Sequence, residues 1–227
     1  MGTSKGYIPP TTLHWKESKR AVTSYINCMD YESREKAIRK FAEAMRSDIA
    51  ASAEFVNAAG SVIAFANLVA TDGFNNALHN YGRDDLIGKS SSEIYSALLQ
   101  EFTNYGSTTE GYLSYVSISG ALEALEISDL EQLKDLDPTI LLKEIIIEYV
   151  KNCFAFRYEE KILERKTPDE TDRILSEMNE YISNELHTKL VIDDIMRDDF
   201  TRMDSLDVVK KCLESAYRVF MIFYGDE

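Results

Sequence analysis

The sequence contains little cysteine and little histidine, three residues of each among 227. The cysteines lie far apart, at Cys28, Cys153 and Cys212, and no secretory signal precedes them. We therefore expect no disulfide framework, but reduced thiols buried in the helices of a cytoplasmic protein. No histidine stands three or four residues from a cysteine or from another histidine, so the usual zinc-ligand spacing is missing and we expect no metal site.

The short motifs of common enzymes are also missing. The chain has no G-x-x-x-x-G-K-[ST], no G-x-G-x-x-G and no G-x-S-x-G, which argues against a nucleotide-binding loop and a hydrolase nucleophile. Three tight acidic pairs remain, at Asp84–Asp85, Asp193–Asp194 and Asp198–Asp199. Asp194 and Asp198 could share a helix face in a metal-dependent nuclease, but the whole chain is acidic, which favours solvated surface carboxylates. We expect no catalytic residue and no cofactor.

Positive charge is scarce: 25 Lys and Arg stand against 39 Asp and Glu, a net charge of −14. Phosphates would repel such a protein, so we expect no direct binding to nucleic acid. The charge is uneven along the chain. Residues 1–48 hold 9 basic and 6 acidic groups (+3), and the remainder holds 25 − 9 = 16 basic and 39 − 6 = 33 acidic groups (−17). This polarity could steer a partner, or it could dock the first helices on the rest of the chain.

Proline and glycine are few, at four and ten residues, which favours long helices over many-stranded sheets. A long apolar run is missing as well. The least polar window, Phe55–Thr71, has no charge over its 17 residues but contains Asn57, Gly60 and Asn67. A membrane-acting effector could use this window, but its modest apolarity favours a buried helix, and we expect no membrane segment.

What the chain does contain is helical periodicity with clear start signals. Asp30 can cap a second helix, Ser90 or Ser91 and Ser107 or Thr108 can cap helices in the middle, and Asp137 before Pro138 marks the start of the most hydrophobic one. Further start signals are the Thr167–Glu170 capping box and Ser205. No strand pattern and no internal repeat is present. We predict an all-α protein: a single multi-helix globular domain over residues 15–227, preceded by an extended N-terminal arm over residues 1–14.

Tyrosine is frequent, with 13 residues. Three of them lie around a predicted turn, at Tyr105, Tyr112 and Tyr115. They could line a groove, or their amphipathic rings could pack at the edge of the core.

The arm fits neither helix nor strand. Gly2 and Gly6 loosen the backbone, whereas Pro9 and Pro10 favour an extended, polyproline-like segment. We expect removal of Met1, which would leave Gly2 with a free amine. Such a segment could enter the cleft of another protein, or it could simply be a frayed terminus. N-myristoylation at Gly2 is disfavoured because the acceptor pattern has Ser or Thr where this chain has Gly6.

The arm and the middle of the chain resemble the QatB proteins of bacterial Qat anti-phage systems. The resemblance rests on Met1–Ser4 followed by a Gly/Pro-containing segment, and on a series of short motifs in the family's order within residues 60–126. These motifs are Phe74–Leu78, Leu86–Gly88, Glu93–Ile94, Ala97–Leu98 and Ser107–Thr109. The arm is shorter and less proline-rich than is usual in the family, and the C-terminal hundred residues carry no similarity beyond being helical.

The resemblance implies a non-catalytic defence protein encoded beside a P-loop ATPase, a QueC-like (QatC-like) enzyme and a TatD-like nuclease. It implies that Gly2 is the acceptor of a deazaguanine group transferred by the QueC-like partner. Thr3, Ser4 and Lys5 would be recognised by that enzyme, and residues 6–10, with Gly6, Tyr7, Pro9 and Pro10, would bind it and supply reach. The alternative is a helical scaffold for a defence ATPase or nuclease, in which the arm has no role.

Overall fold

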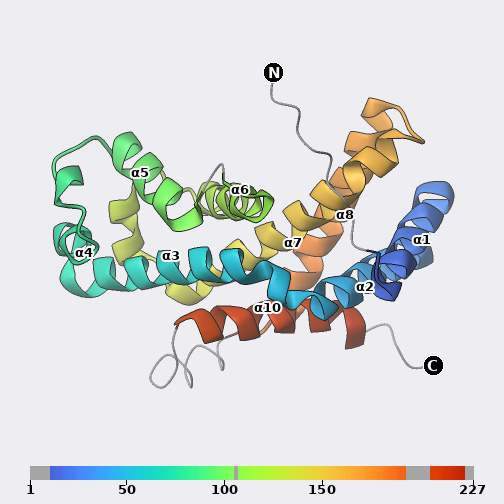
Figure 1. Ribbon diagram of the computed structural model, residues 1–227, viewed down its shortest axis with the longest axis horizontal. Coiled ribbons are helices and arrows are strands. Elements are labelled where there is room, and N and C mark those ends of the chain that lie inside the picture. Colours follow the sequence, from blue (N-terminus) through green and yellow to red (C-terminus); the bar gives the residue numbers. More distant parts are fainter. Residues whose placement is uncertain (1–10, 105–106, 193–204, 223–227) are drawn as a thin grey trace.

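The computed structural model describes residues 11–104, 107–192 and 205–222, and in these ranges the chain is all-α, as predicted. The elements are α1 (Leu13–Cys28), α2 (Tyr31–Ser47), η1 (Ile49–Ser52), α3 (Ala53–Asp72), α4 (Phe74–Asn80), η2 (Asp84–Leu86), α5 (Ser91–Thr103), α6 (Thr109–Ala124), η3 (Leu130–Asp135), α7 (Pro138–Leu163), α8 (Pro168–Lys189) and α10 (Ser205–Ile222). Figure 1 shows α3 running along the long axis from the end that holds α4 and α5 towards the middle of the molecule, with α1, α2 and α8 towards the other end.

The predicted helix starts at Asp30, Ser90, Asp137 and Thr167 are confirmed by side-chain caps. The Asp30 carboxylate accepts a hydrogen bond from the Ser33 backbone N–H at 2.7 Å, and Asp137 accepts one from Thr139 at 2.8 Å. Ser90 and Thr167 each form a full capping box with a glutamate three residues later. These contacts satisfy backbone donors that have no partner inside the helix, which is why the chain enters each helix at that residue.

Helix α7 occupies the centre of the fold. It packs against α6 and α8 and also contacts α3 and α10. Its buried side chains point to more than one side of the helix: Leu141, Leu142, Ile145, Ile146, Ile147, Tyr149, Val150, Cys153, Phe154, Tyr158 and Ile162. A helix that is apolar on several sides is stable only when neighbours cover it, so the sequence of α7 predicts its central place.

The apolar window before Gly73 lies in α3. By length and composition, Ile49–Asp72 is long and apolar enough to cross a membrane, and half of its most apolar window is buried inside the fold. The large side chains Phe55, Ile63 and Phe65 are buried, and α3 contacts α4, α5, α6, α7 and α10. These contacts are those of a core helix, as we expected for Phe55–Thr71.

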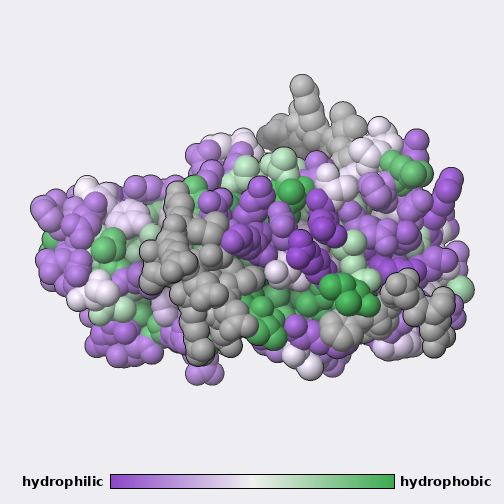
Figure 2. Space-filling view, turned by 90° about the horizontal axis from the view of Figure 1, so that it is seen from below, coloured by the Kyte–Doolittle hydropathy of each residue, from purple (hydrophilic) through white to green (hydrophobic). Residues whose placement is uncertain are grey.

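The surface seen from the α10 side is largely hydrophilic, with small hydrophobic patches between polar side chains (Figure 2). Among the described residues the large exposed apolar side chains are Leu13, Tyr31, Ile87, Tyr112, Ile140, Leu163, Val191 and Ile222. They come from many different elements of the fold. Such scattered exposure is ordinary for a globular protein.

One prediction about the cysteines is wrong. Cys153 and Cys212 are buried, but Cys28 is exposed at the last position of α1. The next residue, Met29, adopts the left-handed conformation (φ 53°) and ends the helix. Residue 28 thus lies on the outward side of the turn into α2, a position that helical periodicity alone does not show.

Candidate partner-binding site at the N-terminal hairpin

The residues proposed as the site from the sequence lie outside the described part of the chain. This holds for the acceptor Gly2 and for the predicted partner-binding residues Thr3, Ser4, Lys5, Gly6, Tyr7, Pro9 and Pro10. The structure therefore describes only the last four residues of the predicted arm, Thr11–His14, and the place where they join the fold.

The chain enters the fold at the molecular surface. Thr11, Thr12 and His14 are exposed, and Leu13 retains 66% of its accessible surface although it begins α1. The helix thus starts two residues before the predicted boundary, within the usual uncertainty of helix ends. Trp15 is the first buried residue, at 2% exposure. Any segment that precedes Thr11 is consequently joined to an outward-facing end of the fold.

Trp15 anchors this end to the central helix. The Arg157 guanidinium carbon lies 4.2 Å from the centre of the Trp15 ring, and Phe41 meets the ring edge-on at 6.4 Å between ring centres. One turn later, the Ser18 hydroxyl hydrogen-bonds the Tyr158 hydroxyl. A cation over an indole face and a close aromatic contact are both stabilising, so the first turn of α1 is held on α7.

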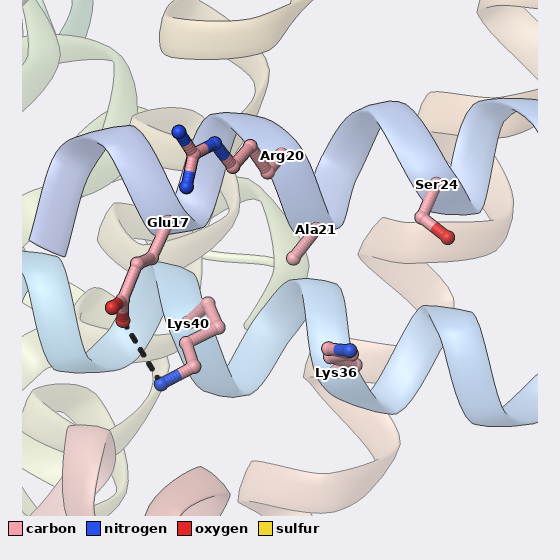
Figure 3. A pocket seen from close by; sticks show the side chains of 6 residues that line it. All are labelled: Glu17, Arg20, Ala21, Ser24, Lys36 and Lys40. Atoms are coloured by element: carbon pink, nitrogen blue, oxygen red, sulfur yellow. Dashed lines mark ion pairs between the residues drawn. The ribbon is translucent and has the colours of Figure 1, made fainter.

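A groove of about 310 Å³ runs between α1 and α2 (Figure 3). Its lining residues are Glu17, Arg20, Ala21, Ser24, Lys36 and Lys40. The small Ala21 side chain lies between the two helices, with charged side chains around it. Arg20 is about 10 Å along the helix from Leu13, at 1.5 Å per residue, so the groove begins close to the attachment of the arm.

The groove carries more positive than negative charge. Lys40 Nζ lies 3.1 Å from a Glu17 oxygen and 2.7 Å from a Glu43 oxygen. The hydrogen bond to Glu43 is the main cause that raises the pKa of Lys40, so its ammonium stays charged at neutral pH. Arg20 and Lys36 form no ion pair among the described residues. Their two cationic groups remain available to an anionic partner.

Three potential metal ligands also meet here. One ligand atom each of His14, Glu17 and Glu43 lies within 4.8 Å of the other two. Lys40 pairs with both carboxylates, so a divalent cation would have to displace its ammonium. The arrangement is therefore better described as an ion-pair cluster than as a metal site.

The acidic pairs have different positions. Asp193–Asp194 and Asp198–Asp199 lie outside the described residues. Asp84 lies 2.8 Å from His79 Nδ1, and Arg83 donates two hydrogen bonds to Asp85 and one to Glu101. The bonds from Arg83 hold the pKa of Asp85 below its usual value. Asp84 and Asp85 are therefore part of a structural ion-pair network on the surface.

A buried polar cluster, not anticipated from the sequence, lies between α6, α7 and α10. The Tyr149 hydroxyl donates a hydrogen bond to Glu110, and Cys153 and Tyr217 are completely buried close by. Burial raises the pKa of Cys153 to about 12 and raises those of Tyr149 and Tyr217 well above the usual value. The thiol and both phenols therefore stay protonated near pH 7, the opposite of what an activated nucleophile needs.

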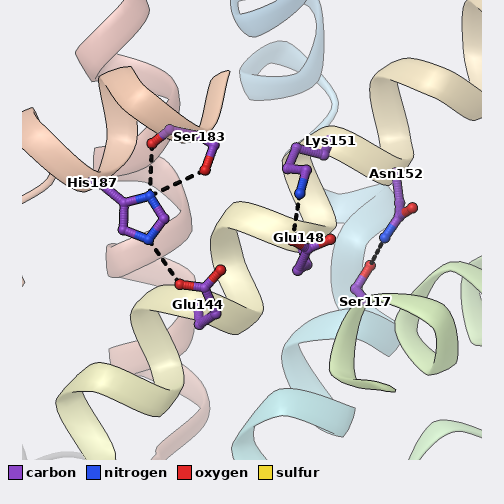
Figure 4. A network of polar contacts seen from close by, with 7 residues as sticks. All are labelled: Ser117, Glu144, Glu148, Lys151, Asn152, Ser183 and His187. Carbon is purple, nitrogen blue, oxygen red and sulfur yellow. Dashed lines mark hydrogen bonds and ion pairs between the residues drawn. The ribbon is translucent and has the colours of Figure 1, made fainter. Parts of the chain in front are cut away.

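Polar contacts on α7 join it to its neighbours (Figure 4). His187 on α8 places Nε2 2.9 Å from Glu144 and Nδ1 2.9 Å from the Ser183 carbonyl oxygen. On another side of α7, Asn152 donates to Ser117 of α6 at 3.2 Å. The His187–Glu144 and Asn152–Ser117 contacts each link two helices, so these residues have structural roles that account for their positions.

Comparison with known proteins identifies the family. A family model described as "Qat anti-phage system associated protein QatB" matches residues 39–220. No curated protein and no solved structure gives a significant match. The family match runs from within α2 to within α10, so it takes in the C-terminal part in which the sequence motifs had shown no similarity, and it leaves out the arm and α1. Because it spans most of the chain, the protein belongs to the QatB family and is a component of an anti-phage defence system.

Proposed function

We propose that this protein is a non-catalytic, cytoplasmic Qat component whose N-terminal arm is bound by a QueC-like partner and modified at Gly2. One observation supports the proposal beyond family membership: the fold presents its N-terminal end outward, with Thr11–His14 exposed and Trp15 as the anchor. Gly2 and Leu13 are 13 − 2 = 11 positions apart along the chain. An extended segment spans at most ~3.5 Å per residue, so Gly2 could reach up to ~38 Å from the start of α1.

The chemistry requires an amine that is unprotonated near neutral pH. An α-amino group has a pKa of ~8 and meets this condition far better than a lysine at ~10.4. In the proposed reaction the Gly2 nitrogen attacks the adenylated carboxyl carbon of a deazaguanine. A C–N amide bond forms, the C–O bond to AMP breaks, and the nitrogen loses a proton to solvent or to a base of the partner. The partner and its ATP supply the activation, and the present chain supplies the acceptor.

The groove between α1 and α2 gives the partner a second contact. Arg20 and Lys36 would attract an acidic surface while the arm occupies the cleft. Charge complementarity of this kind acts mainly on the rate of association. Changing both residues to Glu should therefore slow complex formation at low salt. The matched control changes Arg165 and Lys210, two exposed cations on other parts of the fold, to Glu.

The decisive experiment is intact-mass analysis of the protein made together with its operon partners. We expect a mass increase on the N-terminal peptide that depends on the QueC-like enzyme. Gly2→Pro, which replaces the primary amine by a hindered secondary amine, should abolish the increase. Gly6→Ala, a glycine change in the same arm, should keep it. An unmodified Gly2 beside an active partner, with no complex formed, would exclude the proposal.

One observation favours a second candidate function. The matched family segment is the helical body from residue 39 onward, without the arm. A scaffold that binds the ATPase or the nuclease through this body would need no arm. Deletion of residues 2–10 separates the two functions, because a scaffold keeps phage protection after the deletion and a modification substrate loses it.

A further inference from the structure

A second groove, of about 420 Å³, lies beside the C-terminal end of α6 and is independent of the arm. Its lining residues come from α5, α6 and the turn that follows α6: Tyr95, Tyr115, Ser119, Glu123, Glu126, Ile127 and Ser128. The groove thus combines two tyrosine rings, two serine hydroxyls and two carboxylates. Of the three tyrosines expected around the predicted turn, Tyr115 lines this groove, Tyr112 is 46% exposed and Tyr105 lies outside the described residues.

Two tyrosine rings line this groove. Tyr95 and Tyr115 are both half-buried and lie on neighbouring helices. Burial, the largest effect, raises the pKa of Tyr95 above its ordinary value, so its phenol carries no charge at physiological pH. The face of a neutral aromatic ring is electron-rich and attracts an ammonium or a guanidinium group.

The Glu123 and Glu126 carboxylates add negative charge at the C-terminal end of α6, where the helix dipole is already negative. Glu123 lies in the last turn of α6 and Glu126 just beyond it, at the end where the helix dipole is negative. Lysine, arginine or histidine would stabilise such an end, but the last turn of α6 has none. Among the described residues neither glutamate forms an ion pair. This placement is unfavourable for the isolated fold and favourable for a bound cation.

The backbone holds Glu126 in an unusual conformation. Its φ of 58° is in the left-handed region, where glycine is the usual residue after a helix. The Glu126 N–H donates to the Glu123 carbonyl at 3.0 Å and the Ile127 N–H donates to the Leu122 carbonyl at 2.8 Å. These bonds fix the turn, and the glutamate side chain is thereby held at the groove.

We propose that this groove binds a lysine or arginine side chain from a basic segment of a partner protein. The cation would lie against the Tyr95 and Tyr115 rings and pair with Glu123 or Glu126, and the Ser119 hydroxyl could accept a hydrogen bond from it. The balance of −17 over residues 49–227 attracts such a segment towards the body before contact. The groove volume suits one long side chain with its flanking backbone. Residues 95–128 lie within the matched family segment, so this site belongs to the part of the chain shared with the family.

The test uses the full chain labelled with ¹⁵N and three acetylated, amidated tripeptides, Gly-Lys-Gly, Gly-Arg-Gly and Gly-Gln-Gly. The lysine and arginine peptides should shift the amide signals of residues 126–128 in a saturable way, and the glutamine peptide should not. Glu126→Gln and Tyr95→Leu should each weaken binding of the lysine peptide at least fivefold. Glu180→Gln, an exposed glutamate of α8, is the matched control and should leave binding unchanged. An unchanged unfolding midpoint shows that each variant still folds.

Three outcomes would overturn the proposal. The first is an equal response to the glutamine peptide, which would mean that the groove does not select charge. The second is an equal loss of binding in Glu180→Gln, which would mean that total charge and not the groove attracts the peptide. The third is self-association of the wild-type chain that disappears in Glu126→Gln, because the occupant would then be a second copy of this protein.

Discussion

The central helix α7 and the α1–α2 hairpin are both helical but differ in how much of their surface is buried. In α7, buried residues point to several sides and neighbours cover most of its length. In α1 and α2, one face of each helix is buried, and the other face carries the charges that line a groove. The difference is one of burial: α7 is part of the core on several sides, whereas the hairpin keeps a charged face at the surface.

The two regions are nevertheless joined by an aromatic cluster. Phe41 of α2 meets Phe154 of α7 edge-on, with 5.3 Å between ring centres, and meets Tyr158 at 6.1 Å. Trp15 of α1 also meets Phe41 edge-on, with 6.4 Å between ring centres. These rings join the hairpin to α7 together with the Arg157–Trp15 and Ser18–Tyr158 contacts. Substitutions in this cluster test how far the two regions are independent.

The largest effect is expected for Phe154→Ala in α7. Phe154 is fully buried, so its truncation removes an aromatic side chain and leaves a cavity. We expect the free energy of unfolding to fall by about 3–5 kcal/mol. Denaturant unfolding followed by circular dichroism measures this, with the exposed Glu160→Ala of the same helix as control, for which a change within about 0.5 kcal/mol is expected. A loss below ~1 kcal/mol for Phe154→Ala would contradict the central role of α7.

Trp15→Ala should act locally. The substitution removes the contacts of the first turn of α1 with Phe41 and Arg157 but leaves the α7 core intact. We expect the amides of α1 to exchange with solvent at least tenfold faster, equivalent to ~1.4 kcal/mol, while those of α7 change little. Hydrogen exchange read by mass spectrometry separates the two helices. Equal acceleration in both would show that the hairpin and the core unfold as one unit.

Glu110→Gln should change how stability depends on pH. Burial raises the pKa of Glu110 above its usual 4.5, so folding favours the protonated carboxyl. The stability that this group contributes is complete below the pKa of the unfolded chain and is lost as the pH rises through the folded-state pKa. The wild type should therefore lose stability relative to Glu110→Gln as the pH rises above 4.5 and through the folded-state pKa. Urea unfolding of both proteins across this range measures the difference. A difference that stays constant would refute the interpretation, and exposed Glu180→Gln should show no such trend.

The smallest effect is expected in the labelling rates of the three thiols, and the stability of the protein is not altered in this test. Cys28 is exposed, whereas Cys153 and Cys212 are buried, and burial raises the pKa of Cys153 to about 12. A thiol reagent should quickly label one cysteine per native chain and all three after denaturation. Peptide mapping should place the fast label on Cys28. Cys28→Ser should remove the fast phase, and rapid labelling of either other cysteine in the native protein would contradict the burial described here.

The local features of the fold could be predicted because their causes are local. Asp30, Asp137 and Thr167 cap helices through backbone donors two or three residues away, and the apolar residues of α7 mark a buried helix by their spacing alone. The exposure of Cys28 could not be predicted, since it depends on the turn at Met29 and on which side of α1 meets its neighbours.

The candidate sites show more clearly what could not be predicted from the sequence. Tyr95, Tyr115 and Glu126 meet at one groove because α5 and α6 pack side by side, and Glu110 and Tyr149 are 39 residues apart in the chain. No sequence spacing brings such residues together.

Composition and periodicity were thus enough to establish an all-helical acidic chain, with its helix starts and its most buried helix, because these depend on interactions within a few residues. Packing alone decided which charges face a groove, which carboxyl is desolvated and where the N-terminal end leaves the fold. Those properties depend on contacts between distant segments, and the free energy of such contacts is set by how whole helices fit together.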